Sequence, residues 1–410
     1  MVFLLSKAVQ DLHLIIYTAV QTTTSPPPPQ DKTTLGTASA TTTAPRLRSL
    51  DVFRGITVLA MILVNNPGNW GKIYPPLKHA AWHGCTPTDL VFPFFLFIVG
   101  VSIAYALSGK KLQPETHNKT LLRIVRRGLT LFALGLFLAL FPTFDFTTVR
   151  IPGVLQRIGV VFIIAAALFL KTERKTQITV LAVLLVGYWL LMMFVPVPGI
   201  GEANLQPTTN MAAWVDNSLL PGHLWKFSKV WDPEGVLSTL PAVATALIGV
   251  LVGQWLKKIG DAGNKIAWLM VWGVICTCAG LIWDLHFPIN KSLWTSSFVL
   301  YTAGLAMLGL GLCYWLIDVK GYRRFTTPFL VYGVNAITVF FLSGLIPRIM
   351  AMIKVDTPTG EVDSKTWLYE TFYTPALSPY NASLAWALTW IAFWMVILYI
   401  MYRKNIIIKV

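Results

Sequence analysis

Long apolar windows constrain this chain more than any other feature of its sequence. A helix that crosses a hydrocarbon core of roughly 30 Å needs about 20 apolar residues, and ten such windows follow one another here. The composition agrees, because 55% of the residues are apolar and only 12% are charged. These values exclude a soluble globular enzyme and predict an all-α polytopic membrane protein of about ten transmembrane helices. The predicted windows are 50–66, 88–108, 121–141, 153–170, 176–195, 236–256, 265–285, 293–317, 328–353 and 383–402.

Lysine and arginine are distributed unevenly around these windows. With both ends of the bundle in the cytoplasm, 21 basic residues lie on the cytoplasmic side and ten on the opposite side. The positive-inside rule therefore predicts cytoplasmic N- and C-termini. The same distribution accounts for most of the net charge of +15, so no nucleic-acid partner is expected.

Residues 1–45 differ from the rest of the chain, because Thr, Ser, Pro and Ala dominate them. Such a composition cannot bury a core, so we predict a disordered low-complexity tail at 1–45 and a transmembrane domain at 46–410. The four cysteines are scattered and show no zinc-ligand spacing, and no metal is expected.

The first outer loop, between the first two windows, concentrates residues that could carry chemistry. It contains Asn65, His79, Trp82 and Asp89. An imidazole with an ordinary pKa of about 6.5 accepts a proton at neutral pH, and a neighbouring Asn or Asp could orient it or bind a polar substrate. The alternative is an interfacial role, since His and Trp are common at the headgroup level.

Each of the charged residues elsewhere has two interpretations. Arg54 and Arg157 lie inside apolar windows, where an arginine either pairs with a carboxylate or lines a tunnel for an anionic ligand such as a phosphate. Arg126 belongs to a basic cytoplasmic run that is a topology signal or a nucleotide-phosphate contact. Asp232 and Glu234 could recognise a sugar or an amine, but Asp followed by Pro is also typical of a helix start.

Seven strings, read in order, resemble the heparan-alpha-glucosaminide N-acetyltransferase family and its bacterial members, within the transmembrane acyltransferases. The resemblance covers residues 46–410. Its strings are RSLDVFRG at 48–55, KHAAWHG at 78–84, DLVFPFFLFIVG at 89–100, RIPGVLQRIGV at 150–160, WDPEG at 231–235, PINKSLW at 288–294 and GVNAI at 333–337.

The resemblance implies transfer of an acetyl group from cytoplasmic acetyl-CoA to the amino group of a terminal glucosamine across the membrane. It implies that His79 is catalytic, with Asn65 and Asp89 beside it, either as the general base or as a transient acetyl acceptor. It also implies a homodimer. The CoA candidates are Arg54, Arg126 and Arg157, and the candidates for the acceptor or gate are Trp82, Asp232, Glu234, Asn290 and Lys291.

The sequence shows no lysosomal features, so we expect a bacterial cytoplasmic (inner) membrane and a periplasmic amino sugar or cell-wall saccharide as the acceptor. Two alternatives stay open. One is an O-acyltransferase that modifies a cell-envelope glycan. The other, from a different functional class, is a sugar permease, in which His79 would be merely interfacial.

Overall fold

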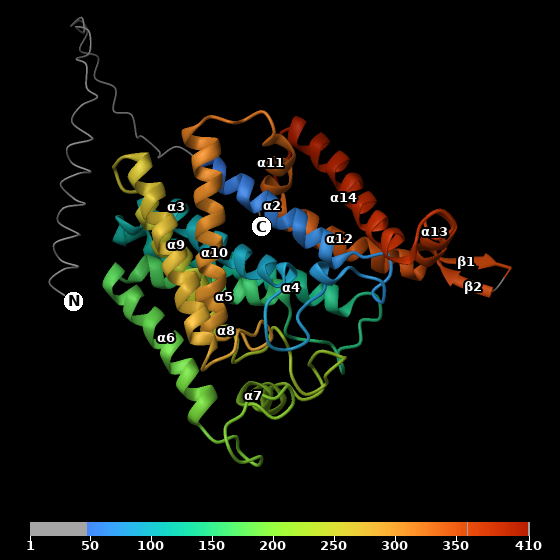
Figure 1. Ribbon diagram of the computed structural model, residues 1–410, viewed down its shortest axis with the longest axis horizontal. Coiled ribbons are helices and arrows are strands. Elements are labelled where there is room, and N and C mark those ends of the chain that lie inside the picture. Colours follow the sequence, from blue (N-terminus) through green and yellow to red (C-terminus); the bar gives the residue numbers. More distant parts are fainter. Residues whose placement is uncertain (1–46, 359, 409–410) are drawn as a thin grey trace, which may run out of the picture. The chain divides into compact units, whose positions relative to one another are not determined.

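The computed structural model describes residues 47–358 and 360–408, and the predicted tail at 1–45 lies outside the described residues. The described chain is mostly helical, so the prediction of an all-α membrane protein is confirmed (Figure 1). Its helices are α2 Arg48–Asn65, α3 Val91–Lys111, α4 His117–Leu140, α5 Val154–Lys171, α6 Arg174–Phe194, α7 Met211–Leu219, α8 Thr239–Leu256, α9 Ala262–Asp284, α10 Ser296–Cys313, α11 Thr327–Val334, α12 Ala336–Met352, α13 Ser364–Phe372 and α14 Pro379–Arg403.

Every predicted window coincides with a helix or a helix pair. Within the described residues, seven helices are long and apolar enough to span a membrane, namely α3, α5, α6, α8, α9, α10 and α14. The bent pair α11 and α12 passes the same criterion together. Helices α2 and α4 occupy the other two windows, but each holds at least three charged residues in any stretch of 18, which lowers its apolar character.

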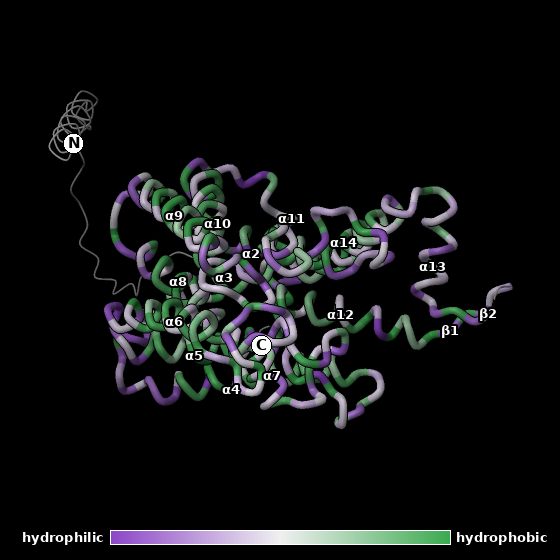
Figure 2. Tube along the Cα trace, turned by 60° about the horizontal axis from the view of Figure 1, so that its bottom comes forward, coloured by the Kyte–Doolittle hydropathy of each residue, from purple (hydrophilic) through white to green (hydrophobic). Residues whose placement is uncertain are grey.

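The helices differ in how far they are buried. In the spanning segment of α8, 72% of the residues are buried inside the protein, against 17% in α9. Figure 2 shows that hydrophobic residues nevertheless follow both helices, while hydrophilic residues gather where helices end. Helix α9 lies at the periphery and packs on α10 along one side. Its apolar residues suit a lipid environment on the remaining sides.

The ninth predicted window is not one straight span. Helices α11 and α12 meet at an angle of 78° around Asn335. The buried Asn335 carboxamide donates to the Ile406 carbonyl at 3.1 Å and accepts from the Ile408 amide at 3.0 Å. The Asn335 side chain therefore makes two hydrogen bonds to the main chain of the C-terminal segment. The bend between the two helices lies at this residue.

Helices α2 and α11 approach closely through glycines. A Cβ added at Gly55 would lie 1.7 Å from the Phe329 carbonyl oxygen, and one at Gly333 would lie 2.1 Å from the Asp51 carbonyl oxygen. These backbone atoms cannot swing aside as a flexible side chain would, so the two helices must separate to admit a methyl group.

We therefore expect Gly55→Ala to lower the free energy of unfolding by about 1–3 kcal/mol, the usual cost of overpacking. Denaturant titration of the full chain in detergent micelles measures the change. Gly109→Ala, within α3, is the matched control, because its added Cβ meets no atom within 4 Å. Equal effects of the two substitutions would show that the α2–α11 contact is not tight.

The segment after α12 contains an antiparallel hairpin that the sequence analysis did not predict. Strand β1, Lys354–Thr357, pairs with β2, Gly360–Asp363, with Val355 opposite Val362. The Asp363 side chain then accepts from the Thr366 amide at 3.0 Å and caps α13. Figure 1 shows the hairpin and α13 at one end of α12 and α14.

Candidate functional site

His79 and Asp89 form a close pair in the segment between α2 and α3. Asp89 Oδ1 lies 2.6 Å from His79 Nδ1, and Asp89 is only 1% exposed. The other carboxylate oxygen, Oδ2, accepts from the Ala80 and Thr86 amides, each at 3.0 Å. These bonds fix the carboxylate on a 3-10 turn, Pro87–Leu90, that leads into α3. Because Asp89 contacts Nδ1, the second ring nitrogen, Nε2, is the one that Asp89 leaves available for proton transfer.

Lys291 reaches the same histidine from the loop between α9 and α10. Its Nζ lies 3.2 Å from His79 Nδ1 and 3.3 Å from Nε2, and 3.8 Å from Asp89 Oδ1. Burial lowers the pKa of Lys291, against the opposing effect of the carboxylates of Glu234 and Asp89. The structure thus brings together three residues that the sequence analysis selected from two distant segments.

A backbone contact joins the two loops that carry these residues. The Gly84 amide donates to the Ile289 carbonyl at 2.7 Å, and Gly84 bridges to Asn290 as in a parallel ladder. Asn290 is fully buried, and its Oδ1 accepts from the Leu293 amide at 2.9 Å. Asn290 therefore shapes the loop that presents Lys291.

A cavity of about 60 Å³ opens beside the histidine. Its polar end is formed by Asn65, His79, Thr88, Glu234 and Lys291. The rest is apolar, with walls from α2, α3, α5 and α12 that include Met61, Phe92, Phe95, Leu155, Ile158 and Phe340. Three of the acceptor candidates, Trp82, Asp232 and Asn290, do not line it. The Trp82 indole donates to the Leu205 carbonyl at 2.9 Å and packs edge-on against Trp231.

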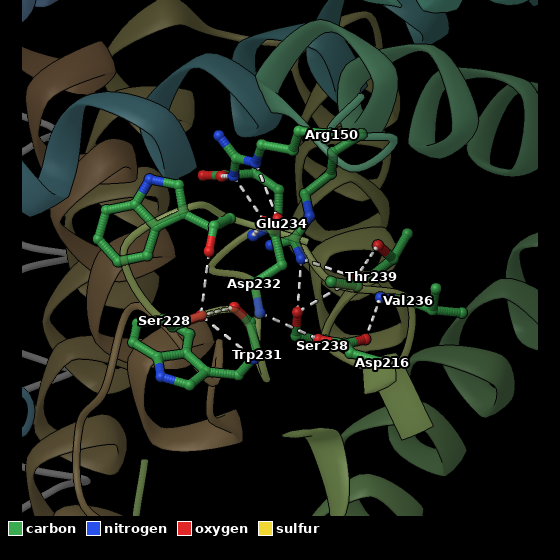
Figure 3. A network of polar contacts seen from close by, with 12 residues as sticks. Arg150, Asp216, Ser228, Trp231, Asp232, Glu234, Val236, Ser238 and Thr239 are labelled. Atoms are coloured by element: carbon green, nitrogen blue, oxygen red, sulfur yellow. Dashed lines mark hydrogen bonds and ion pairs between the residues drawn. The ribbon is translucent and has the colours of Figure 1, made fainter. Parts of the chain in front are cut away.

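The WDPEG segment is organised by Arg150, which precedes α5 (Figure 3). Arg150 binds Asp232 through two nitrogens, Nε at 2.8 Å and Nη2 at 2.5 Å, and the same Nη2 lies 2.5 Å from Glu234 Oε2. Burial opposes the charged form of Arg150, but the two carboxylates outweigh it and raise the pKa of Arg150. The ion pairs hold Glu234 at the cavity wall.

The helix-start interpretation of this segment is wrong. Helix α8 begins at Thr239 with Ser238 as its N-cap residue, seven positions after Asp232. The Asp232 carboxylate instead binds Arg150 and accepts from the Glu234 amide at 2.9 Å. A bidentate arginine contact satisfies a buried carboxylate better than a cap would, and it fixes a turn rather than a helix.

Arg150 is the residue that sequence reasoning missed, since the topology argument counted it only as one of the ten outer basic residues. It does open the string RIPGVLQRIGV at 150–160. That string was the available signal, but no local pattern pairs Arg150 with carboxylates 82 and 84 positions away.

The three CoA candidates occupy three different environments. Arg54 in α2 binds Asp51 Oδ1 and Ser102 Oγ, each at 2.9 Å. Arg126 is exposed on α4. Arg157 is buried at the start of α5, where Nη2 donates to the Gly235 carbonyl at 3.0 Å. The structure therefore associates Arg157 with the WDPEG segment and does not bring the three arginines together.

Asp216, in α7, is hydrogen-bonded to the main chain of the same segment and of the residue that follows it. Its carboxylate accepts from the Val236 amide at 2.7 Å and the Asp232 amide at 3.3 Å. Burial raises the pKa of Asp216 to about 6, and the nearby Asp232 adds to this, although the two amides and Arg157 oppose it. The folded state therefore holds a proton on this carboxyl more tightly than the unfolded chain does.

This raised pKa gives stability a defined dependence on pH. The contribution of Asp216 is complete below its unfolded pKa of 3.8 and is lost as the pH rises through about 6. The loss between pH 4 and 7 has an upper limit of about 3 kcal/mol. Denaturant titrations across this range should show a smaller loss for Asp216→Asn than for the wild type, because an amide does not titrate. Parallel pH profiles would contradict the assignment.

Among the described residues, 47–358 and 360–408, no group of three or more His, Cys, Asp and Glu side chains is arranged to hold a metal ion.

Comparison with known proteins adds to this geometry. The family described as "Heparan-alpha-glucosaminide N-acetyltransferase, catalytic" matches residues 46–279. A Homo sapiens protein named heparan-alpha-glucosaminide N-acetyltransferase is 30% identical over 420 residues, which cover 89% of this chain and 60% of the human protein. A Mus musculus protein of the same name is 33% identical over 353 residues, covering 72% of this chain and 53% of the mouse protein.

The chain thus spans 60% of the length of the human relative and 53% of the mouse relative. The family match nevertheless covers more than half of this chain and includes Asn65, His79, Asp89 and Glu234. Five of the seven strings that carry the resemblance lie within the matched residues. The chain belongs to the heparan-alpha-glucosaminide N-acetyltransferase family.

Proposed function

We propose that this protein is a membrane-embedded acetyltransferase that moves the acetyl group of acetyl-CoA to the amino group of a glucosamine-type sugar. The observation that carries the proposal is the His79–Asp89 pair at the polar end of an otherwise apolar cavity. Membership of the family supports it, since the human and mouse relatives bear the name of an N-acetyltransferase.

The donor would occupy the apolar part of the cavity. Acyl-CoA thioesters carry a slender, largely uncharged arm, which suits walls such as Phe92, Phe95 and Leu155. Asn65 stands at the C-terminal end of α2, and Arg54 lies three turns earlier, about 16 Å along the helix axis. With its thioester beside Asn65, the donor would therefore run along α2 and direct its phosphates toward Arg54 and Arg126.

The acceptor amine would bind between Glu234 and His79. Glu234 uses Oε2 for Arg150, and in the described part of the chain its Oε1 has no hydrogen-bond partner. Oε1 is therefore available for the ammonium group of an amino sugar. The Asp232 carboxylate binds Arg150, the Trp82 indole donates to the Leu205 carbonyl and the Asn290 side chain accepts from the Leu293 amide. These three residues would therefore shape the acceptor site without contacting the acceptor amine.

His79 would act in one of two ways. As a general base, Nε2 removes a proton from the acceptor amine while that amine attacks the thioester carbonyl, and Asp89 stabilises the imidazolium that results. As a nucleophile, Nε2 is first acetylated and the amine then attacks the acetyl-histidine. Asn65, whose carboxamide has no hydrogen-bond partner among the described residues, would orient the thioester carbonyl in either route.

The location of the enzyme follows from the same proposal. The excess of basic residues on one side favours cytoplasmic termini, with donor entry from the cytoplasm and the acceptor on the outer face. The bacterial cytoplasmic membrane, the periplasmic opening and the homodimer stay predictions.

The test is transfer of a labelled acetyl group from acetyl-CoA to glucosamine by the full chain in detergent or liposomes. We expect labelled N-acetylglucosamine and no product from glucose, which lacks the amino group. Labelled ester on glucose instead would favour an O-acyltransferase. Uptake of unmodified sugar into liposomes without acetylation would favour a permease and overturn the proposal.

A further inference from the structure

Lys291 presents a primary amine where the proposed reaction needs one. Its Nζ lies 3.3 Å from His79 Nε2, within reach of the atom that would remove a proton from the acceptor. The side chain lines the same cavity as Asn65 and Glu234 and is 18% exposed. The chemical group of the acceptor, a primary amine, is therefore already present in the chain at the candidate site.

The position of this amine is fixed by the fold. The Gly84–Ile289 hydrogen bond and the buried Asn290 hold the Lys291 loop against the His79 loop. Burial lowers the pKa of Lys291, which enlarges the fraction of neutral, nucleophilic amine. Lys78, the neighbour of His79 in the sequence, is exposed and does not line the cavity.

We propose that Lys291 is a self-acetylation site: with a CoA thioester bound and no acceptor sugar present, the enzyme transfers the acetyl group to its own Lys291 Nζ. The proposal rests on the proposed function, because it uses the same donor and the same base.

The step balances without any further reactant. The Lys291 amine attacks the carbonyl carbon of the thioester, so a carbon–nitrogen bond forms and the carbon–sulfur bond breaks. The sulfur leaves with the electron pair as the CoA thiolate. The proton released by the amine passes to His79 Nε2 and from there to the thiolate. The products are acetyl-lysine and free CoA thiol.

Acetylation would switch the enzyme off. It removes the positive charge that lies 3.8 Å from Asp89, and it places an uncharged amide at the polar end of the cavity. The acceptor amine then loses its position beside His79. Preincubation with acetyl-CoA alone should therefore cause a progressive loss of transfer activity, and glucosamine should protect by occupying the site.

The experiment uses the full chain with acetyl-CoA, with and without glucosamine, and identifies acetylated peptides by mass spectrometry. We expect Lys291 to be acetylated in the wild type and in the matched control Lys78→Arg. The rate should fall by about 10² or more in His79→Ala, because the base is missing. Lys291→Arg keeps the charge but offers no acylable amine, so whatever its starting rate, that rate should stay constant during preincubation.

Transfer to glucosamine is measured on the same preparations, so that the two proposals are tested separately. Active transfer with an unmodified Lys291 would overturn the self-acetylation and leave the proposed function intact. Equal acetylation of Lys291 in the wild type and His79→Ala would show chemical modification by the thioester and would also overturn it. Loss of both products in the wild type would overturn both proposals.

Discussion

Replacement of His79 by alanine is expected to lower kcat/KM for acetyl transfer by about 10²–10⁴, the usual contribution of a positioned acid–base group. The physical reason is the contact of Asp89 with Nδ1 at 2.6 Å, which leaves Nε2 as the proton acceptor at the cavity. If His79 is instead acetylated, the loss should be at least as large. Initial rates with labelled acetyl-CoA measure the effect.

His286→Ala is the control for this prediction, because His286 is exposed and lies on the loop that leads to Lys291 without lining the cavity. Its rate should match the wild type. Rapid quenching followed by mass spectrometry separates the two routes, since only the nucleophilic route places an acetyl group on His79 during turnover. An unchanged rate in His79→Ala would remove the histidine from the proposed mechanism.

Arg150→Ala is expected to lower the free energy of unfolding by about 3–5 kcal/mol, the cost of leaving buried carboxylates without their counter-charge. Asp232 has no exposed side-chain surface and Glu234 only 7%, so water cannot replace the guanidinium. Transfer activity should also fall, because Glu234 is no longer held at the cavity. Denaturant titration in detergent and initial rates measure the two losses.

A compensating variant distinguishes the loss of charge balance from a loss of packing. Arg150→Met combined with Asp232→Asn and Glu234→Gln keeps the approximate volume and removes all three charges. It should recover most of the stability but not the activity, because the acceptor ammonium still lacks a carboxylate partner. Recovery of both would show that Glu234 does not bind the acceptor.

The helices could be predicted from the sequence because each needs only a long apolar window. The bend at Asn335 could not, because one polar residue barely changes the hydropathy of a window. What sets it apart is a pair of hydrogen bonds to Ile406 and Ile408, more than 70 positions away. The hairpin at 354–363 was missed for a different reason, since two four-residue strands are too short to show a period.

The candidate site could be predicted in part. His79 and Asp89 lie ten positions apart in one loop, so proximity in sequence and the family resemblance both favoured them. Lys291 is 212 positions from His79, and no local pattern pairs the two residues. Arg150 was missed because its role depends on a contact with Asp232 that no local pattern encodes.

The hydrogen bond between Gly84 and Ile289 links the loop that carries His79 to the loop that carries Lys291. A change in bilayer thickness is accommodated chiefly by helix tilt, which would alter the spacing of α2, α3, α5 and α12 around the apolar cavity. Because the two loops are hydrogen-bonded to each other, the distance between His79 and Lys291 would change little with that tilt. Lipid composition should therefore change the KM for the thioester donor more than it changes kcat.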